Sequence, residues 1–413
     1  MRVVVAGGGF AGFWAAAAAA RLRRDTPDTL ETLEILLISR DDHLVIRPRL
    51  YEPDPSRMAV PLIPRLEAIG VQFVRSEISS IDPAEARIRL GEAEIKYDRL
   101  VLATGSQLTR PASAAAAYGF DIDTLASAGE FDRHLHQLAT QAESDGRWTV
   151  VIAGGGFTGI ELATALPDRL REIAGGAARI RVVVVDPAER MGASLGDGPQ
   201  TAIRDALAAA RIEERTGVTI VSADQGGVVL STGERIACGT LVWATGMRAS
   251  PLAARISKKT DGLGRMEVSP ELRVLGPNAG IDRVFAAGDV ARAVADDGHA
   301  ILQSCQHAQM TGRFAGYNVA ADLAGLPLQA YRQPVYTTCL DLGEAGAVLT
   351  AGWDRTVVAM GEDAKAIKRR INTQLIYPPA ERDAILAAAS PSVMDEDTFR
   401  SRILNVKSDA GRA

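Results

Sequence analysis

Residues 2–16 read RVVVAGGGFAGFWAA, and residues 149–163 read TVVIAGGGFTGIELA. Each stretch is a β-branched run, a G-x-G-x-x-G pattern and a series of small residues, which predicts a strand, a tight turn and a helix. The first glycine lets the chain leave the strand, the second lets backbone approach a pyrophosphate, and the third lets the helix pack on the strand. Free N–H groups at the helix start can then bind phosphate. One such match can be an unliganded turn, but two copies in the same context predict two dinucleotide-binding sites.

The repetition extends beyond the two turns. The strands predicted at 33–40 and 180–187 place Ser39 and Asp186 at equal distances from Gly12 and Gly159. Each half then continues in the same order, with glycine–valine strands at 69–74 and 216–221, hairpin-like segments at 86–97 and 227–238, and closing strands at 99–106 and 240–247. The sequence therefore predicts an α/β protein with two Rossmann-like dinucleotide-binding domains.

The second copy interrupts the first. Residues 283–290, RVFAAGDV, predict a further strand that follows the second copy, and we assign it to the first sheet. The first domain is thus expected to be discontinuous, at 1–110 and 275–330, and to enclose an inserted domain at 111–274. Residues 331–413 are expected to form a smaller α+β segment that begins with strands within 335–352.

Composition excludes several classes of protein. The 413 residues have a net charge of −5, and acids and bases are interspersed, which does not suggest a nucleic-acid binder. Cys238, Cys305 and Cys339 are far apart, so no C-x-x-C pair predicts a metal site or a redox disulfide. Lone cysteines fit a reducing compartment, and no signal peptide or membrane-spanning helix is predicted. We therefore expect a cytoplasmic protein.

Together these features resemble the two-dinucleotide-binding-domain flavoproteins, which include the pyridine-nucleotide–disulfide oxidoreductases, over about residues 1–325. Within that superfamily the chain is most similar to type II NADH dehydrogenases, through HLVIRPRLYE at 43–52, GGGFTGIELA at 154–163 and QSCQHAQ at 303–309. The resemblance implies an enzyme with FAD in the discontinuous domain and NAD(P)H in the inserted one. Hydride would pass from NADH to FAD, and electrons would pass on to a quinone-like acceptor without a redox disulfide.

The expected FAD-binding residues are Gly7, Gly9, Phe10, Ala11, Gly12, Ser39, Arg40, Arg47, Pro48, Ala103, Thr104, Gly105, Gly288 and Asp289. Ser39 replaces the carboxylate typical of the family, but its hydroxyl can still bond the ribose, and Arg40 can lie over the adenine. Arg47, Pro48 and Tyr51 either line the flavin or belong to an ordinary loop. Asp289 is placed to bind a ribityl hydroxyl or a phosphate-bound water; the alternative is a turn or helix-capping aspartate.

The expected nicotinamide-nucleotide residues are Gly154, Gly156, Phe157, Thr158, Gly159, Asp186, Thr245 and Gly246. A carboxylate at the position of Asp186 bonds both ribose hydroxyls and repels a 2′-phosphate, so NADH is preferred over NADPH. The alternative is a surface turn acid before Pro187, and the nearby Arg190 weakens the preference.

Two residues are candidates for the catalytic site. The resemblance places Glu161 at the flavin–nicotinamide junction, where it would position the nicotinamide or relay protons; the alternative is an acid that complements the helix dipole. Gln306 lies on a helix expected over 300–323, where it touches the acceptor or serves as a buried amide. The family pattern has a second glutamine where this chain has Met310, which weakens the case for quinone. An acid–base role for His307 on the same helix is less favoured than a core or surface role.

The C-terminal segment leaves two interpretations open. Residues 364–379 contain Lys365, Lys368, Arg369 and Arg370, and a cationic amphipathic helix can lie on an anionic membrane face. A solvated face or a homodimer surface is the interpretation that we favour. The electron acceptor is open as well, and the alternatives are a dedicated small-molecule or electron-carrier acceptor, or a flavin-binding redox sensor with little turnover.

Overall fold

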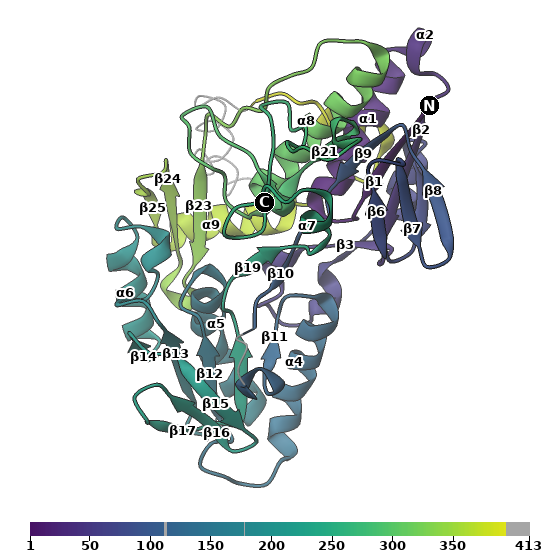
Figure 1. The fold of residues 1–413 in the computed structure, drawn as a ribbon. Helices are drawn as coiled ribbons and strands as arrows, with labels where there is room; N and C mark the ends of the chain where they lie inside the picture. The colour runs from purple at the N-terminus through teal and green to yellow at the C-terminus, as the bar shows by residue number, and fades with distance from the viewer. Residues whose placement is uncertain (111–113, 177, 394–413) are drawn as a thin grey trace.

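The computed structural model describes residues 1–110, 114–176 and 178–393 (Figure 1). Two five-stranded parallel sheets form its framework, and they repeat one topology. The first sheet has the order β21-β9-β1-β2-β5, with β1 Arg2–Ala6, β2 Glu34–Ser39, β5 Gln72–Arg75, β9 Arg99–Leu102 and β21 Val284–Ala286. The second has the order β11-β18-β12-β13-β14, with β11 Phe120–Asp121, β12 Thr149–Ala153, β13 Arg181–Asp186, β14 Glu213–Thr216 and β18 Thr240–Trp243. The predicted pair of Rossmann-like folds is confirmed.

The insertion of one fold into the other is visible in the strand pairing. β21 lies far along the chain, yet it pairs in parallel with β9 and completes the first sheet, as predicted. In the second sheet β11 takes the corresponding place beside β18, although it precedes the repeated motif. The chain crosses between the two sheets in β10 Ser106–Leu108 and β19 Met247–Ala249, which pair with each other in antiparallel fashion (Figure 1).

One predicted strand is in the wrong place. The strand that pairs with β13 at the edge of the second sheet is β14, Glu213–Thr216, whereas a strand was expected at residues 216–221. Gly217, at φ +69°, ends β14, and the chain continues as β15 in a separate antiparallel sheet. The glycine–valine match with residues 69–74 therefore gave the wrong position for this strand, because β14 is a polar strand, EERT, without the usual apolar run.

Two further antiparallel sheets accompany the parallel ones. They are β6-β7-β8, at Ser80–Asp82, Arg87–Leu90 and Ala93–Lys96, and β15-β16-β17, at Ile220–Asp224, Gly227–Leu230 and Arg235–Ala237.

The inserted domain was expected to end at residue 274, but the packing places its end earlier in the chain. Ala253 and Ile256 of α7, Leu252–Ile256, and Met266 of β20, Met266–Glu267, are buried in the core below the first sheet, with Val4 and Leu100. β20 pairs with β22, Ala291–Arg292, which follows β21. Residues from about 249 onward thus pack with the first sheet, because their apolar side chains face its strands.

Six successive alanines at residues 15–20 belong to α1, Phe10–Asp25. This helix lies against α8, Cys305–Ala324. A Cβ added at Gly312 would lie 2.4 Å from the carbonyl oxygen of Ala11, and one at Gly316 would lie 2.0 Å from that of Ala15. The two helices therefore touch backbone to backbone, which requires small residues on both. The other helices outside the C-terminal segment are α2 Pro27–Leu30, α3 Ile63–Ala68, α4 Leu125–Gln137, α5 Phe157–Ala174 and α6 Gln200–Ala209; β3 His43–Val45 and β4 Ala59–Pro61 form a small ribbon.

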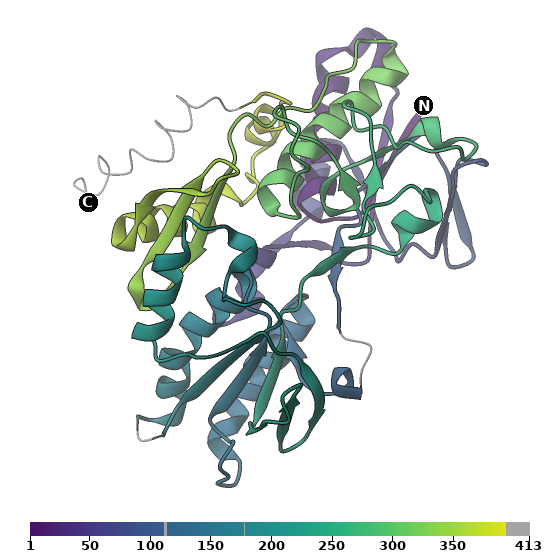
Figure 2. The ribbon, with the colours of Figure 1, turned by 60° about the vertical axis from the view of Figure 1, so that its left-hand side comes forward.

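The C-terminal segment connects the two halves (Figure 2). Its antiparallel sheet is β23 Thr337–Asp341, β24 Ala347–Ala351 and β25 Thr356–Met360, and it continues through α9 Gly361–Arg370, the π-helical η9 Ile371–Leu375 and α10 Arg382–Ala388. β23 contacts α5 of the second half, whereas α10 contacts α1 and α3 of the first. None of the helices in the described ranges has the length and apolar character needed to cross a bilayer.

Candidate active site

The two glycine turns have nearly identical geometry. Gly7 and Gly154 have φ angles of +115° and +116°, and a Cβ on either would lie 2.3 Å from a carbonyl oxygen of the neighbouring strand end. A Cβ on Gly12 or Gly159 would lie 1.8 Å from the carbonyl oxygen of Gly7 or Gly154. Each turn therefore tolerates only glycine at its first and third positions.

The second glycine of each motif is different. No atom lies within 4 Å of a Cβ built on Gly9 or Gly156, and these residues are the N-caps of α1 and α5. The space in front of each helix start is therefore open, and the exposed N–H groups face it. This cradle fits a pyrophosphate, as the motif predicts.

A cavity of about 2050 Å³ joins the two turns. Most of the predicted residues line it, namely Gly7, Gly9, Phe10, Ala11, Ser39, Arg40, Arg47, Pro48, Ala103, Thr104, Gly105, Gly288, Asp289, Gly156, Phe157, Thr158, Glu161, Gly246 and Gln306. The volume and the wall, which combines both halves and the C-terminal segment, can accommodate more than one ligand at a time.

Five predicted residues do not line this cavity. Gly12, Gly154 and Gly159 are enclosed by backbone, and their role is to let the turns close. The hydroxyl of Thr245 donates to the carbonyl oxygen of Thr109, which leaves this residue outside the cavity wall. Asp186 accepts hydrogen bonds from the N–H groups of Gly155, at 2.6 Å, and Ala188, at 2.8 Å. These hydrogen bonds fix the Asp186 carboxylate beside the glycine turn. The contact of this carboxylate with a ribose stays a prediction.

The predicted match between Ser39 and Asp186 agrees with the geometry. Ser39 ends β2 and Asp186 ends β13. A Cβ on Gly8 would lie 2.6 Å from Ser39 Oγ, and a Cβ on Gly155 would lie 3.3 Å from Asp186 Oδ2. The two side chains therefore occupy equivalent places beside their glycine turns.

Arg47 and Asp289 belong to one polar cluster. Asp289 lines the cavity and accepts a hydrogen bond from Ser106 Oγ at 2.5 Å, and desolvation of its carboxyl raises its pKa. Arg47 lies 3.9 Å from Asp289 and also pairs with Asp123. Sequence reasoning missed Ser106 and Asp123; the position of Ser106 directly after the A-T-G turn of the first half was the available signal. Arg47, in the short 3₁₀ helix Arg47–Arg49, is therefore anchored by two carboxylates, and its contact with the flavin stays a prediction.

Glu161 is buried and paired with Lys368 of α9. Lys368 Nζ lies 2.7 Å from Glu161 Oε1 and donates to the carbonyl oxygen of Cys339 at 3.0 Å. The N–H of Asp341 donates to the same carboxylate at 3.0 Å. Burial raises the pKa of the Glu161 carboxyl, and the ammonium group of Lys368 opposes this shift. Both side chains line the cavity, so the ion pair is part of its wall.

The Glu161–Lys368 pair corrects one expectation for residues 364–379, namely that their basic side chains all lie on a solvated or dimer-forming face. Lys368 is turned into the protein. Lys365 Nζ lies 2.5 Å from Asp341 Oδ1, and the Tyr51 hydroxyl donates a hydrogen bond to Asp341 Oδ2 at 3.2 Å. Tyr51, expected beside the flavin, is buried behind the wall in this network. Two of the four cations therefore stabilise the interior, because the carboxylates of α5 and β23 lie beneath α9.

Helix α8 begins later than expected. Its first residue is Cys305, and Ser304 caps it by accepting a hydrogen bond from the N–H of His307 at 3.3 Å. Ser304, Cys305 and Gln306 line the cavity, so the helix N-terminus opens onto it. His307 points away into a cluster with Tyr336 and Trp353, where burial lowers the pKa of its imidazole to about 3. This geometry favours the core role for His307 over acid–base chemistry.

Cys305 and Cys339 both line the cavity, although they come from different elements. Burial raises the pKa of these thiols to about 11 and about 12, so both are protonated at neutral pH. Both cysteines are free. Protonated thiols are poor nucleophiles, so the fold brings the two cysteines to one cavity without activating them.

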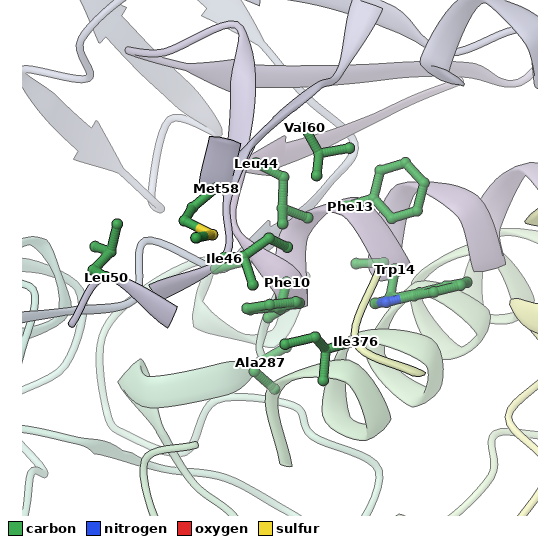
Figure 3. Close-up of a cluster of buried hydrophobic side chains, with 14 of the residues drawn as sticks. Phe10, Phe13, Trp14, Leu44, Ile46, Leu50, Met58, Val60, Ala287 and Ile376 are labelled. Atoms are coloured by element: carbon green, nitrogen blue, oxygen red, sulfur yellow. The ribbon is translucent and has the colours of Figure 1, made fainter. Parts of the chain in front are cut away.

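One part of the cavity wall combines residues of α8 and of the C-terminal segment, and it is apolar apart from one arginine. We call it the α8–η9 wall; its apolar residues are Met310, Ile371, Leu375, Ile376 and Val393, and its arginine is Arg313. Figure 3 shows Ile376 beside Phe10 and Trp14 of α1. The sequence did not predict this wall, because its residues come from three segments that only the fold brings together.

The fold and site define a class: the chain belongs to the pyridine nucleotide-disulphide oxidoreductase family, whose model matches residues 1–312. It is therefore an oxidoreductase enzyme. It is 44% identical over 398 residues to an NADH dehydrogenase-like protein of Mycobacterium tuberculosis, a match that covers 95% of this chain and 98% of that protein. It is 28% identical to the demethylphylloquinone reductase of Synechocystis, over 84% of this chain and 86% of that one.

Among solved structures, NDH2 of Plasmodium falciparum in complex with NADH matches with a TM-score of 0.75 at 11% identity, over 94% of this chain and 97% of that one. This likeness shows the shared fold. The expected resemblance to type II NADH dehydrogenases is confirmed by the relatives, and NADH-driven flavoprotein oxidoreduction is the activity class that they support.

Proposed function

We propose that the protein oxidises NADH through FAD and passes the electrons to a quinone bound at the α8–η9 wall, without a redox disulfide. The observation that supports this most directly is that one cavity connects the open cradle at Gly9, the open cradle at Gly156 and an apolar wall. FAD, when bound, supplies a carrier that takes two electrons from a nicotinamide and passes them on. The two relatives named for NADH dehydrogenase and quinone reductase activity point the same way.

The chain's own residues have distinct roles in this proposal. The N–H groups at the starts of α1 and α5 bind the pyrophosphates, and Ser39 and Asp186 bind the riboses. Asp186 disfavours a 2′-phosphate, so NADH is the expected donor. Arg47, held by Asp123 and Asp289, orients polar groups of the flavin.

Reduction of a quinone to a quinol consumes two protons as well as two electrons. Glu161 Oε1 and Lys368 Nζ hold a proton between them at the cavity wall. The network beyond them, Asp341 with Lys365, extends to more accessible side chains, because Lys365 is 17% exposed. We therefore assign Glu161 to proton supply and Gln306, at the start of α8, to contact with the acceptor.

The test is anaerobic mixing of the purified holoprotein with NADH, followed by a panel of acceptors. Rapid bleaching of the flavin absorbance and turnover with a water-soluble quinone are expected. Bleaching followed by turnover only with an electron-carrier protein or oxygen would contradict the quinone assignment. A stable charge-transfer band with negligible turnover would indicate a redox sensor, and a colourless protein that refuses FAD would refute the proposal as a whole.

A further inference from the structure

The α8–η9 wall contains a cation that has no counter-charge among the described residues. Arg313, on α8, stacks its guanidinium on the indole of Trp14, with Cζ 4.3 Å from the ring centroid, and its Nη1 donates to Met310 Sδ at 3.6 Å. Its Nε is buried and has no hydrogen-bond partner among the described residues. Within the described ranges no carboxylate pairs with Arg313. The side chain lines the cavity, so the unpaired charge faces a ligand space.

Two other arginines on the cavity wall are paired with carboxylates, whereas Arg255 is exposed to solvent and donates to the carbonyl oxygen of Ser79. Arg47 pairs with Asp123 and Asp289, and Arg332 pairs with Asp296 at 2.8 Å. Burial lowers the pKa of Arg313 to about 10, and this value still leaves it charged at neutral pH. A buried charge without a partner is costly to a fold, which favours a ligand that brings the opposite charge.

The surroundings restrict what that ligand can be. Leu375, Ile376 and Val393 make the rest of the α8–η9 wall apolar. Such a wall suits an apolar ring, such as that of a quinone, more than a sugar or a free phosphate. One ionised oxygen group on that ring can then reach the N–H groups of Arg313.

We propose that Arg313 makes the α8–η9 wall selective for a planar quinone-like acceptor that bears a single anionic group, either an ionised hydroxyl or a carboxylate. The proposal rests on the quinone function proposed above and adds the charge of the substrate to it. Arg313 is thus a specificity-determining residue for the acceptor.

The experiment compares two acceptors with the same ring. One is a 1,4-naphthoquinone with a propanoate side chain, and the other is its neutral methyl ester. Each is titrated onto the oxidised holoenzyme without NADH to obtain Kd, and KM is then measured with NADH. The carboxylate should bind about 10- to 100-fold more tightly than the ester, the range expected for one charged hydrogen-bonded contact.

Arg313→Gln should abolish this preference, and Arg313→Lys should retain part of it, because the ammonium group keeps the charge but not the planar fork. Arg332→Gln is the matched control on the same cavity, and its ratio of the two Kd values should equal that of the wild type. Flavin content and NADH-dependent bleaching report whether each variant is folded.

Several outcomes separate the two proposals. Equal affinity for both acceptors in the wild type, or a preference that survives in Arg313→Gln, overturns the anion site and leaves the quinone function standing. Tight carboxylate binding without turnover supports the anion site and refutes the quinone function.

Acidic residues of this chain are tested as an alternative source of the counter-charge. Residues Asp395, Glu396 and Asp397 follow Val393 in the sequence, so the full-length triple variant with Asn, Gln and Asn at these positions is tested too. A preference that emerges only in this variant would show that the chain neutralises Arg313 itself and would overturn the proposal.

Discussion

Lys368→Met is the perturbation that tests the buried charge pair most directly. The substitution keeps most of the side-chain volume but removes the ammonium group 2.7 Å from Glu161 Oε1. The remaining partner of that oxygen is then the N–H of Asp341, at 3.0 Å. Removing one partner of a buried ion pair costs about 3–5 kcal/mol, because the other charge is left uncompensated. We therefore expect the free energy of unfolding at pH 8 to fall by about this amount.

The loss should depend on pH in a defined direction. Burial already raises the pKa of Glu161, and without Lys368 the folded-state pKa rises further. Between the unfolded and the folded pKa the native state binds a proton that the unfolded state does not. The Lys368→Met variant therefore keeps its stability below the pKa of Glu161 in the unfolded chain. Its free energy of unfolding then falls by about 1.4 kcal/mol for each pH unit as the pH rises toward the pKa of Glu161 in the folded protein.

The assay is urea unfolding of the wild type and Lys368→Met from pH 5 to pH 9. Glu161→Gln in the Lys368→Met background should recover much of the loss and remove its pH dependence, since no buried carboxyl remains to ionise. Arg181→Met is the control, because its partner Glu213 is 39% exposed and such surface pairs contribute about 1 kcal/mol or less. A pH-independent loss in Lys368→Met, or no recovery in the double variant, would refute the reasoning.

Three further predictions follow from the site. Gly9→Glu should yield a colourless protein, because the side chain fills the open cradle with negative charge, whereas Gly9→Ala should retain FAD with weaker affinity, because its methyl group adds bulk without charge where backbone approaches the pyrophosphate; a yellow Gly9→Glu protein would disprove the cradle assignment. Cys305→Ser with Cys339→Ser should leave steady-state NADH oxidation within about twofold of the wild type, because thiols whose burial keeps them protonated take no part in transfer; a large loss would imply a sulfur relay. Asp186→Ala should lower the KM for NADPH relative to that for NADH in initial-rate assays, and an unchanged ratio would remove Asp186 from donor selection.

The sequence by itself determined the repeated framework. Backbone geometry requires glycine at 7, 12, 154 and 159, and the approach of backbone to a pyrophosphate favours it at 9 and 156, so the spacing identified both turns, both helix starts and both cradles. The β-branched runs beside them identified the buried parallel strands, because such strands need apolar side chains on both faces. Where this signal is weak, as in the polar β14, the prediction failed.

Only the tertiary structure decided what completes the cavity. Lys368 stands within a run of basic residues that looks solvated, yet α9 turns it toward Glu161, which lies far away in the sequence. Arg313 acquires its significance from the cavity that it lines and from the absence of a carboxylate among the described residues around it. Local sequence patterns encode backbone conformation. Which charged groups lie next to a buried side chain depends on packing between segments far apart in the sequence, and here the C-terminal segment contributes that packing.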